Sequence, residues 1–244
     1  MRVRSCLAIA LVCSLSGTTA AAQNQPASTV RTLLAAGSLG GLADRPFFFR
    51  LYRVLLSAAQ RSSYNGANGM LYGLSGALEI DIAGTPSSLV EGGGTYIPAG
   101  RPATISASGA GPADFLIFEL SPRPNQTAPL LDPDAVEELY RTPEPVPGLK
   151  PGPYEFSLTR VSLPPGMPAN PPHYRSGAAL YYILSGSGLF TVAGNTEPRT
   201  AGMPHFEPAG MVHQWANPAD TPLVLIQANI SQEGIPAVIA PGAK

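Results

Sequence analysis

An internal repeat is the feature of this sequence that most restricts the fold. Around Tyr72 the chain reads LYGLSGALEIDIAG, and around Tyr182 it reads YYILSGSGLFTVAG. Further on, GGGTYIPAG begins at Gly92 and GMPHFEPAG at Gly202. All matches share an offset of 110 residues, and they pair Tyr72 with Tyr182, Leu74 with Leu184, Gly76 with Gly186, Gly84 with Gly194, Gly92 with Gly202, Pro98 with Pro208 and Gly100 with Gly210. Two copies of one structural unit are therefore predicted.

The repeated unit is predicted to be made of β-strands. The paired residues are turn glycines, turn prolines and apolar residues, so the two copies share a backbone geometry. The 26 glycines and 27 prolines fall between short apolar runs, which is typical of many short strands. Strands are expected at Phe48 to Leu56, Leu78 to Ile82, Phe115 to Leu120, Leu189 to Val192 and Leu223 to Gln227.

The first 22 residues have the pattern of a secretory signal peptide. MRVR is basic, CLAIALVCSL is apolar, and Ala20 to Ala22 form a small-residue cleavage site. We expect a mature chain that begins near Gln23, has no membrane span and is exported to the periplasm or the extracellular space. Both cysteines, Cys6 and Cys13, lie in this segment. The mature chain therefore forms no disulfide, and its stability depends on its own core.

The mature sequence is expected to divide into two barrels and a linker. We predict an amino-terminal barrel at residues 23–120, a linker at 121–153 and a carboxy-terminal barrel at 154–244. The linker is proline-rich at both ends. A short helix is expected within it, because Asp132 is a good N-cap, Pro133 suits the first helical position and Arg141 lies near the expected end.

The charge balance argues against a nucleic-acid partner. Without Arg2 and Arg4 the chain has 13 basic and 16 acidic side chains, and it contains no basic run. A small-molecule ligand is expected instead, because small β-barrels enclose a cavity of about that size.

The second copy carries a motif that resembles the second cupin motif. That motif is written G, five residues, P-x-G, two residues, H, three residues, N, and it is matched at Gly202, Pro208, Gly210, His213 and Asn217. The first cupin motif is matched only in part by PPHYRSGAALYYILSG. There His173 takes the first histidine position and Gly186 the closing glycine, whereas Arg175 stands at the second histidine position. The chain thus resembles a bicupin, and the resemblance implies two tandem jelly-roll barrels.

A metal site is predicted in the carboxy-terminal barrel. The resemblance places two ligands, His173 and His213. His205 and Glu207 are two residues apart on one strand and therefore share a face. The first copy has Ile97 where the second has Glu207, so Glu207 is expected to point inward, where a cation or the guanidinium of Arg175 would neutralise it.

The sequence allows two interpretations of each of these residues. His205 is either a metal ligand or a satisfied histidine, and Glu207 either binds a metal or pairs with an arginine. Arg175 either binds an anionic ligand through its planar fork or is an exposed rim residue. Trp215 and one of Tyr181 and Tyr182 either line the cavity mouth or belong to the core.

In the first copy, Ser63 and Ala103 stand at the positions of His173 and His213, so no metal is expected there. That copy is predicted to be structural.

The sequence supports more than one function. The leading hypothesis is an exported bicupin that binds a divalent transition metal and a small, anionic molecule, with turnover left open. Copper, zinc, manganese and iron are all candidates, and the general affinity order favours copper or zinc. The alternatives are a non-catalytic binding or sensing module and a structural homo-oligomer that assembles through edge strands. The fold alone does not choose among them.

Overall fold

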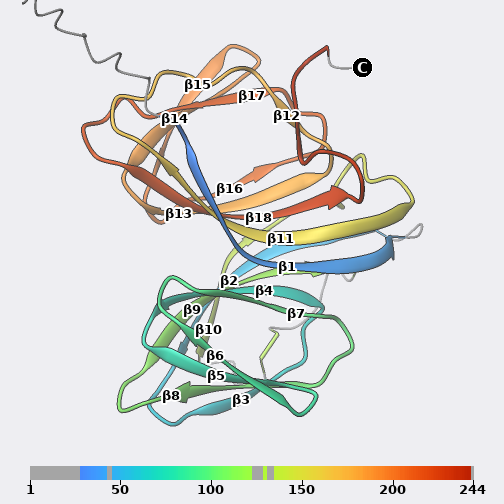
Figure 1. Cartoon of the computed structure of the whole chain (residues 1–244), viewed down its shortest axis with the longest axis vertical. Coiled ribbons are helices and arrows are strands. Elements are labelled where there is room, and N and C mark those ends of the chain that lie inside the picture. Colours follow the sequence, from blue (N-terminus) through green and yellow to red (C-terminus); the bar gives the residue numbers. More distant parts are fainter. Residues whose placement is uncertain (1–27, 43–45, 123–128, 131–134, 243–244) are drawn as a thin grey trace, which may run out of the picture.

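The computed structural model describes residues 28–42, 46–122, 129–130 and 135–242, and these residues form an all-β protein (Figure 1). The predicted signal peptide lies outside the described residues, so export stays a prediction. No helix long and apolar enough to span a bilayer occurs in the described part of the chain.

The strands predicted from the sequence are part of a larger set in the structure. All five predicted strands of the chain are present. The first half contains β1 (Val30–Leu42), β2 (Phe48–Leu56), β3 (Arg61–Tyr64), β4 (Asn68–Ser75), β5 (Ala77–Ile82), β6 (Thr85–Val90), β7 (Gly94–Ile97), β8 (Ala103–Ser108), β9 (Ala113–Ser121) and β10 (Val136–Arg141).

The second half repeats this arrangement of short strands. It contains β11 (Gly152–Leu163), β12 (Tyr174–Arg175), β13 (Ala178–Ser185), β14 (Ser187–Val192), β15 (Asn195–Thr200), β16 (Pro204–Glu207), β17 (His213–Ala216), β18 (Leu223–Gln232) and β19 (Val238–Ile239).

The strands form two barrels that lie one above the other in Figure 1. In the described residues the first barrel has sheets with the strand orders β10-β2-β9-β4-β7 and β3-β8-β5-β6. The second has β1-β11-β18-β13-β16, β15-β14-β17 and the short pair β12-β19. The two large sheets correspond strand for strand in β2-β9-β4-β7 and β11-β18-β13-β16, as the repeat predicts.

Three apolar clusters hold the molecule together. One fills the first barrel and includes Leu71, Ile97 and Ile117, and another fills the second barrel and includes Tyr181, Phe190 and Trp215. The largest lies between the two five-stranded sheets, where Phe49, Met70 and Phe118 of the first half pack with Phe156, Leu180 and Ile230 of the second. The large sheets are therefore buried on both faces, and the two barrels share a core.

Two strands do not follow the expected domain boundaries. β1 belongs by sequence to the amino-terminal unit but pairs with β11, for example Arg31 with Val161. β10 lies in the predicted linker but pairs with β2. The boundaries at residues 120 and 153 stay a prediction, and each large sheet contains one strand from outside its own unit.

The helix predicted in the linker is wrong for the residues that the structure describes there. Val136–Arg141 is a strand at the edge of the first barrel. Pairing with β2 satisfies the backbone hydrogen bonds of this segment and outweighs the local helix signals. The expected helix start at Asp132 and Pro133 lies outside the described residues.

The repeated turns explain the matching glycines. The β5–β6 and β14–β15 hairpins each have a two-residue turn, Ala83-Gly84 and Ala193-Gly194, in which both residues have positive φ. Positive φ at both positions is the geometry of the type I′ turn, which suits the twist of a hairpin. Both copies tolerate an alanine in the left-handed region, which normally favours glycine or asparagine.

Candidate functional site in the carboxy-terminal barrel

The strand register places the predicted site residues on the inner face of the second barrel. β13 pairs with β16, so that Ala179 lies opposite Glu207 and Tyr181 opposite His205. Cross-strand partners point to the same face, and Ala179 and Tyr181 belong to the barrel core. Both His205 and Glu207 therefore point inward, as their shared face predicts.

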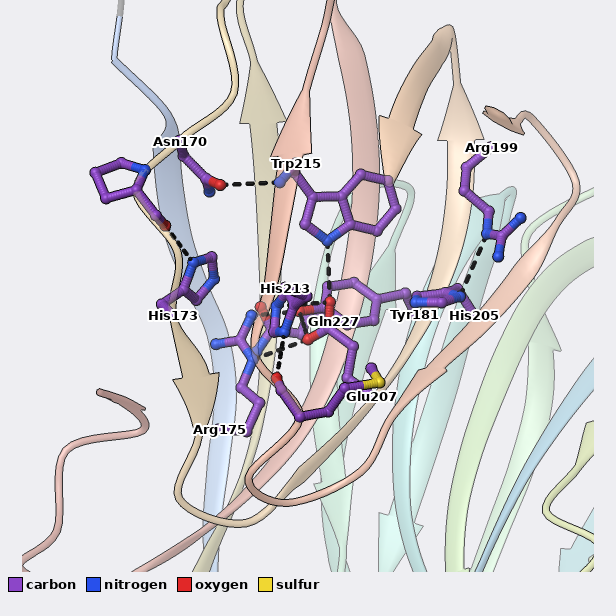
Figure 2. Close-up of polar contacts among 12 residues, drawn as sticks. Asn170, His173, Arg175, Tyr181, Arg199, His205, Glu207, His213, Trp215 and Gln227 are labelled. Atoms are coloured by element: carbon purple, nitrogen blue, oxygen red, sulfur yellow. Dashed lines mark hydrogen bonds and ion pairs between the residues drawn. The ribbon is translucent and has the colours of Figure 1, made fainter. Parts of the chain in front are cut away.

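Glu207 is the centre of a dense hydrogen-bond network, which Figure 2 shows. Arg175 Nε donates to Oε2 at 3.0 Å, and the Tyr181 hydroxyl donates to the same oxygen at 2.6 Å. Trp215 Nε1 donates to Oε1 at 2.9 Å, and His213 Nε2 lies 3.1 Å from that oxygen. Arg175 also donates to the Tyr181 hydroxyl. The carboxylate thus has two partners on each oxygen.

This network keeps Glu207 ionised although its side chain is fully buried. Burial by itself would raise the pKa of the carboxyl, but the contact with His213 and the charge of Arg175 outweigh it and hold the pKa well below its ordinary value. The side chain of Arg175 is 2% exposed, so the pair is a buried ion pair. Of the two alternatives for Glu207, the structure shows the pair with an arginine. Arg175 is buried and is therefore not an exposed rim residue.

His173 and His213 come together at one end of the network. The two residues exchange backbone hydrogen bonds, and their ring centroids are 4.4 Å apart. Nδ1 of His173 donates to the carbonyl of Pro171 at 2.9 Å, and Nδ1 of His213 donates to the carbonyl of Met211 at 2.8 Å. Because a carbonyl only accepts, both Nδ1 atoms carry hydrogen. Burial also lowers the pKa of His173.

The four predicted metal ligands are only partly assembled. In a histidine that binds a metal, the other ring nitrogen usually donates to a backbone carbonyl or a carboxylate. His173 and His213 both have such a contact at Nδ1, so both Nε2 atoms point away from the backbone. However, Nε2 of His213 faces Glu207, whose oxygens also accept hydrogen bonds from Arg175, Tyr181 and Trp215. No group of three or more His, Cys, Asp or Glu side chains in the described residues is placed to hold a metal. A structural or catalytic metal site requires three or four donors.

His205 lies apart from the pair, as Figure 2 shows. Its Nδ1 accepts a hydrogen bond from Arg199 Nε at 3.3 Å, and its ring lies 4.1 Å from the ring of Phe190. Burial lowers its pKa to about 4, so the ring is neutral at physiological pH. Nε2 is buried without a hydrogen-bond partner among the described residues. These contacts describe a core histidine.

The predicted aromatic residues have different positions. Trp215 is 4% exposed, belongs to the barrel core and donates to Glu207. It therefore supports the buried carboxylate and does not line the cavity mouth. Tyr182 points to the opposite face of β13 and packs against the core between the sheets, so its prediction as a ligand-binding residue is not supported by the geometry. Tyr181 takes the inner position. The Asn217 side chain donates to the carbonyls of Leu163, Pro164 and Thr221 and accepts from the Ala219 amide, so it stabilises its turn.

Three polar residues near the site were not identified from the sequence. Arg31 on β1 donates to Gln227 on β18 at 3.0 Å, and Asn170 accepts from the backbone amide of Trp215 at 2.8 Å. Arg31 precedes His173 by more than a hundred residues, and only the pairing of β1 with β11 brings it to this barrel. No motif in the sequence indicates such a contact.

Two hollows border the site. One of about 380 Å³ is lined by Thr29, Arg31, Asn170, Pro171, Pro172, His173, Val238 and Ala240. The other, of about 430 Å³, lies beside His213 and the β14–β15 turn. Each volume is within the range of small-molecule sites. The hollow beside His173 combines a positive charge, an imidazole and several apolar side chains.

Residues 159–228, which include most of this barrel and its polar centre, match the family model Cupin_2, described as a cupin domain. The fold is that of the cupins. Oxalate decarboxylase from Bacillus subtilis, in a structure described for its Mn(II) centres, matches with a TM-score of 0.53 and 15% identity, over 88% of this chain and 81% of that chain. AerE from Microcystis aeruginosa matches with a TM-score of 0.54 and 14% identity, over 82% and 99%. A comparison with curated proteins finds no match.

The barrel of the first half has no comparable polar centre at the equivalent positions. Ile97 stands where the second barrel has Glu207, Ala103 where it has His213, and Ile105 where it has Trp215, and all three are buried. The network around Glu207 therefore has no counterpart at the equivalent positions of the first barrel.

Proposed function

We propose that the carboxy-terminal cupin barrel is a binding site for a small, anionic molecule in an exported protein. The ligand occupies the hollow of about 380 Å³ beside His173. The single observation that carries this proposal is the closed ionic network beneath the hollow, in which Arg175 neutralises Glu207 where a metal-binding cupin would need a free ligand. The ligand binds in the hollow next to this network and does not enter it.

Binding is favoured over turnover by the same geometry. Metal-assisted turnover needs an open coordination position and a general acid or base. Glu207 has all of its oxygens engaged, and His205 is neutral and buried among aromatic rings. His173 borders the hollow and is the side chain of the pair that a ligand would contact first.

A divalent metal bound by the histidine pair is the second candidate. It is favoured by one observation, that both Nδ1 atoms are fixed by backbone carbonyls. His173 and His213 would then be the protein ligands, and the remaining positions would be filled by water or the bound molecule. A metal there would polarise a carboxylate or carbonyl oxygen. Its identity, among copper, zinc, manganese and iron, is part of this second candidate.

Calorimetric titration of the purified mature protein tests the binding proposal. The panel contains acetate, butyrate, benzoate, phosphate and neutral glucose. At least one anion is expected to bind, and His173→Ala is expected to weaken it about tenfold, because the variant removes a side chain that packs against the ligand along the wall of the hollow. Ser63→Ala is the matched control, because Ser63 is the equivalent residue of the first barrel and is exposed. Binding that is absent, or equal in both variants, contradicts the proposal.

Elemental analysis of the same preparation separates the two candidates. The proposed anion site needs no metal, so less than half an equivalent is expected after incubation with each divalent ion and removal of the excess. A full equivalent that disappears in His213→Ala would replace the first candidate with the second. Assembly into a homo-oligomer is a further proposal, and gel filtration of the wild-type protein checks it.

A further inference from the structure

The passage into the second barrel is formed by a residue from the other end of the chain. An inner chamber of about 10 Å³, which holds about one water molecule, is lined by Arg31, Asn170, Arg175, Tyr181 and Trp215 among others. The outer hollow beside His173 shares Arg31 and Asn170 with it. Arg31 therefore lies where the chamber meets the hollow.

The register of β1 directs Arg31 to this place. Arg31 is opposite Val161 on β11, and Val161 belongs to the core of the barrel. Because cross-strand partners share a face, the side chain of Arg31 also lies on the barrel side of the sheet, where the residue stays exposed at the barrel opening. Its Nη1 donates to the amide oxygen of Gln227, which is 3% exposed. This contact holds one arm of the guanidinium and leaves the other N–H groups of the fork for another acceptor.

The charges at the passage do not balance. The chamber is bordered by two guanidinium groups, but Glu207 is the carboxylate of the network and it forms its ion pair with Arg175. The hydrogen-bond partner of Arg31 among the described residues is a neutral amide, and no salt bridge of these residues includes Arg31. A positive charge therefore remains at the inner end of the hollow.

The walls of the hollow limit the rest of the ligand. Pro171, Pro172, Val238 and Ala240 line it beside Arg31 and His173. The inner chamber is too small for more than a water molecule, so the body of the ligand stays among these apolar side chains. A carboxylate matches the fork of an arginine, and a short hydrocarbon body matches the walls.

Resting on the proposed function, we propose that Arg31 binds the carboxylate of a small monocarboxylic acid whose apolar body occupies the hollow beside His173. The amino-terminal strand β1 thereby supplies the specificity-determining residue of the carboxy-terminal barrel. Arg31 forms the charged end of the site, and His173 lies along its side. The geometry predicts that acids are preferred over the corresponding amides.

Titration with butyrate and butyramide tests the role of Arg31. Wild-type protein is expected to bind butyrate at least about tenfold more tightly than butyramide. Arg31→Gln should weaken butyrate binding about tenfold and leave butyramide unchanged, whereas Arg31→Lys, which keeps the charge, should recover part of the loss. Arg160→Gln on the adjacent strand β11 is the matched control, because it removes an exposed arginine from the same sheet.

The outcomes distinguish this inference from the proposed function. If Arg31→Gln and Arg160→Gln bind butyrate equally well while His173→Ala does not, the barrel is a binding site but Arg31 does not select the carboxylate. If wild-type protein binds neither butyrate nor any other anion of the panel, both proposals are wrong. A melting temperature for each variant shows that a loss of binding does not reflect unfolding.

Discussion

Glu119 in the first barrel gives a prediction that the structure makes quantitative. Its side chain lies on β9 and is fully buried, and among the described residues neither carboxyl oxygen has a hydrogen-bond partner of normal geometry. Burial raises the pKa of Glu119 from 4.5 to about 7, although the charge of Arg50 and the backbone amide of Ala67 lower it. The contrast with Glu207, whose four partners keep it ionised, is a contrast in hydrogen bonding.

The rise in pKa makes stability depend on pH with a definite sign. Between pH 4.5 and 7 the unfolded chain releases the proton that folded Glu119 keeps, so unfolding becomes more favourable as the pH rises. A pKa difference from 4.5 to about 7 corresponds to about 3 kcal/mol of unfolding free energy, fully expressed above pH 7. The amide in Glu119→Gln cannot ionise, so the unfolding free energy of the variant does not fall with pH for this reason.

Urea denaturation of wild type and Glu119→Gln at pH 4.5, 6 and 7.5 measures the effect. The unfolding free energy of the variant relative to wild type should increase by about 3 kcal/mol across this range. All other ionisable groups are common to both proteins, so their contribution cancels. Exposed Glu79→Gln on β5 controls for the change of net charge. A relative stability that stays constant from pH 4.5 to 7.5 would refute the reasoning.

Three further predictions concern single contacts, each measured by urea denaturation at pH 7. Trp215→Phe removes one hydrogen-bond donor from the buried carboxylate of Glu207 and should destabilise the protein by about 1–3 kcal/mol; no change would contradict the network. Gly186→Ala should destabilise more than Gly194→Ala, because both have positive φ but only the first would bring a Cβ to 2.3 Å from a carbonyl oxygen. Ala83→Asn creates the preferred Asn-Gly turn and should stabilise by about 0.5–1 kcal/mol, and a loss of stability would count against the positive φ of this turn.

Local sequence patterns were sufficient for the five predicted strands and for the direction of Glu207. The repeat aligns turn residues, and turn geometry depends on the residues themselves. The equivalence of Ile97 and Glu207 indicated an inward side chain because the two copies share a backbone. The conclusion required no knowledge of long-range contacts.

The face of β13 could not be predicted in the same way. Tyr181 points into the barrel and Tyr182 into the core between the sheets, so the strand is buried on both sides. A strand with two buried faces has no alternation of apolar and polar residues to indicate its orientation.

The position of Arg31 and the fate of the linker depend on strand pairing between distant segments. β1 joins β11, and β10 joins β2, and both pairings cross the boundaries that the repeat suggests. Helix signals around Asp132 are local, whereas the pairing partner of Val136–Arg141 is determined by the whole sheet. Sequence patterns of a single chain contain no direct information about such partners.

The pairing of β1 with β11 also affects when this protein can fold during translation. During translation Val30–Leu42 is synthesised first, but its partner Gly152–Leu163 follows only after more than a hundred further residues. At roughly 5–20 residues per second, β1 must wait on the order of ten seconds. During that interval Leu34 and Leu39, which pack against the core between the sheets in the folded protein, have no sheet to cover them. Nascent chains that stall before residue 163 should therefore be the form of this protein that most needs a chaperone.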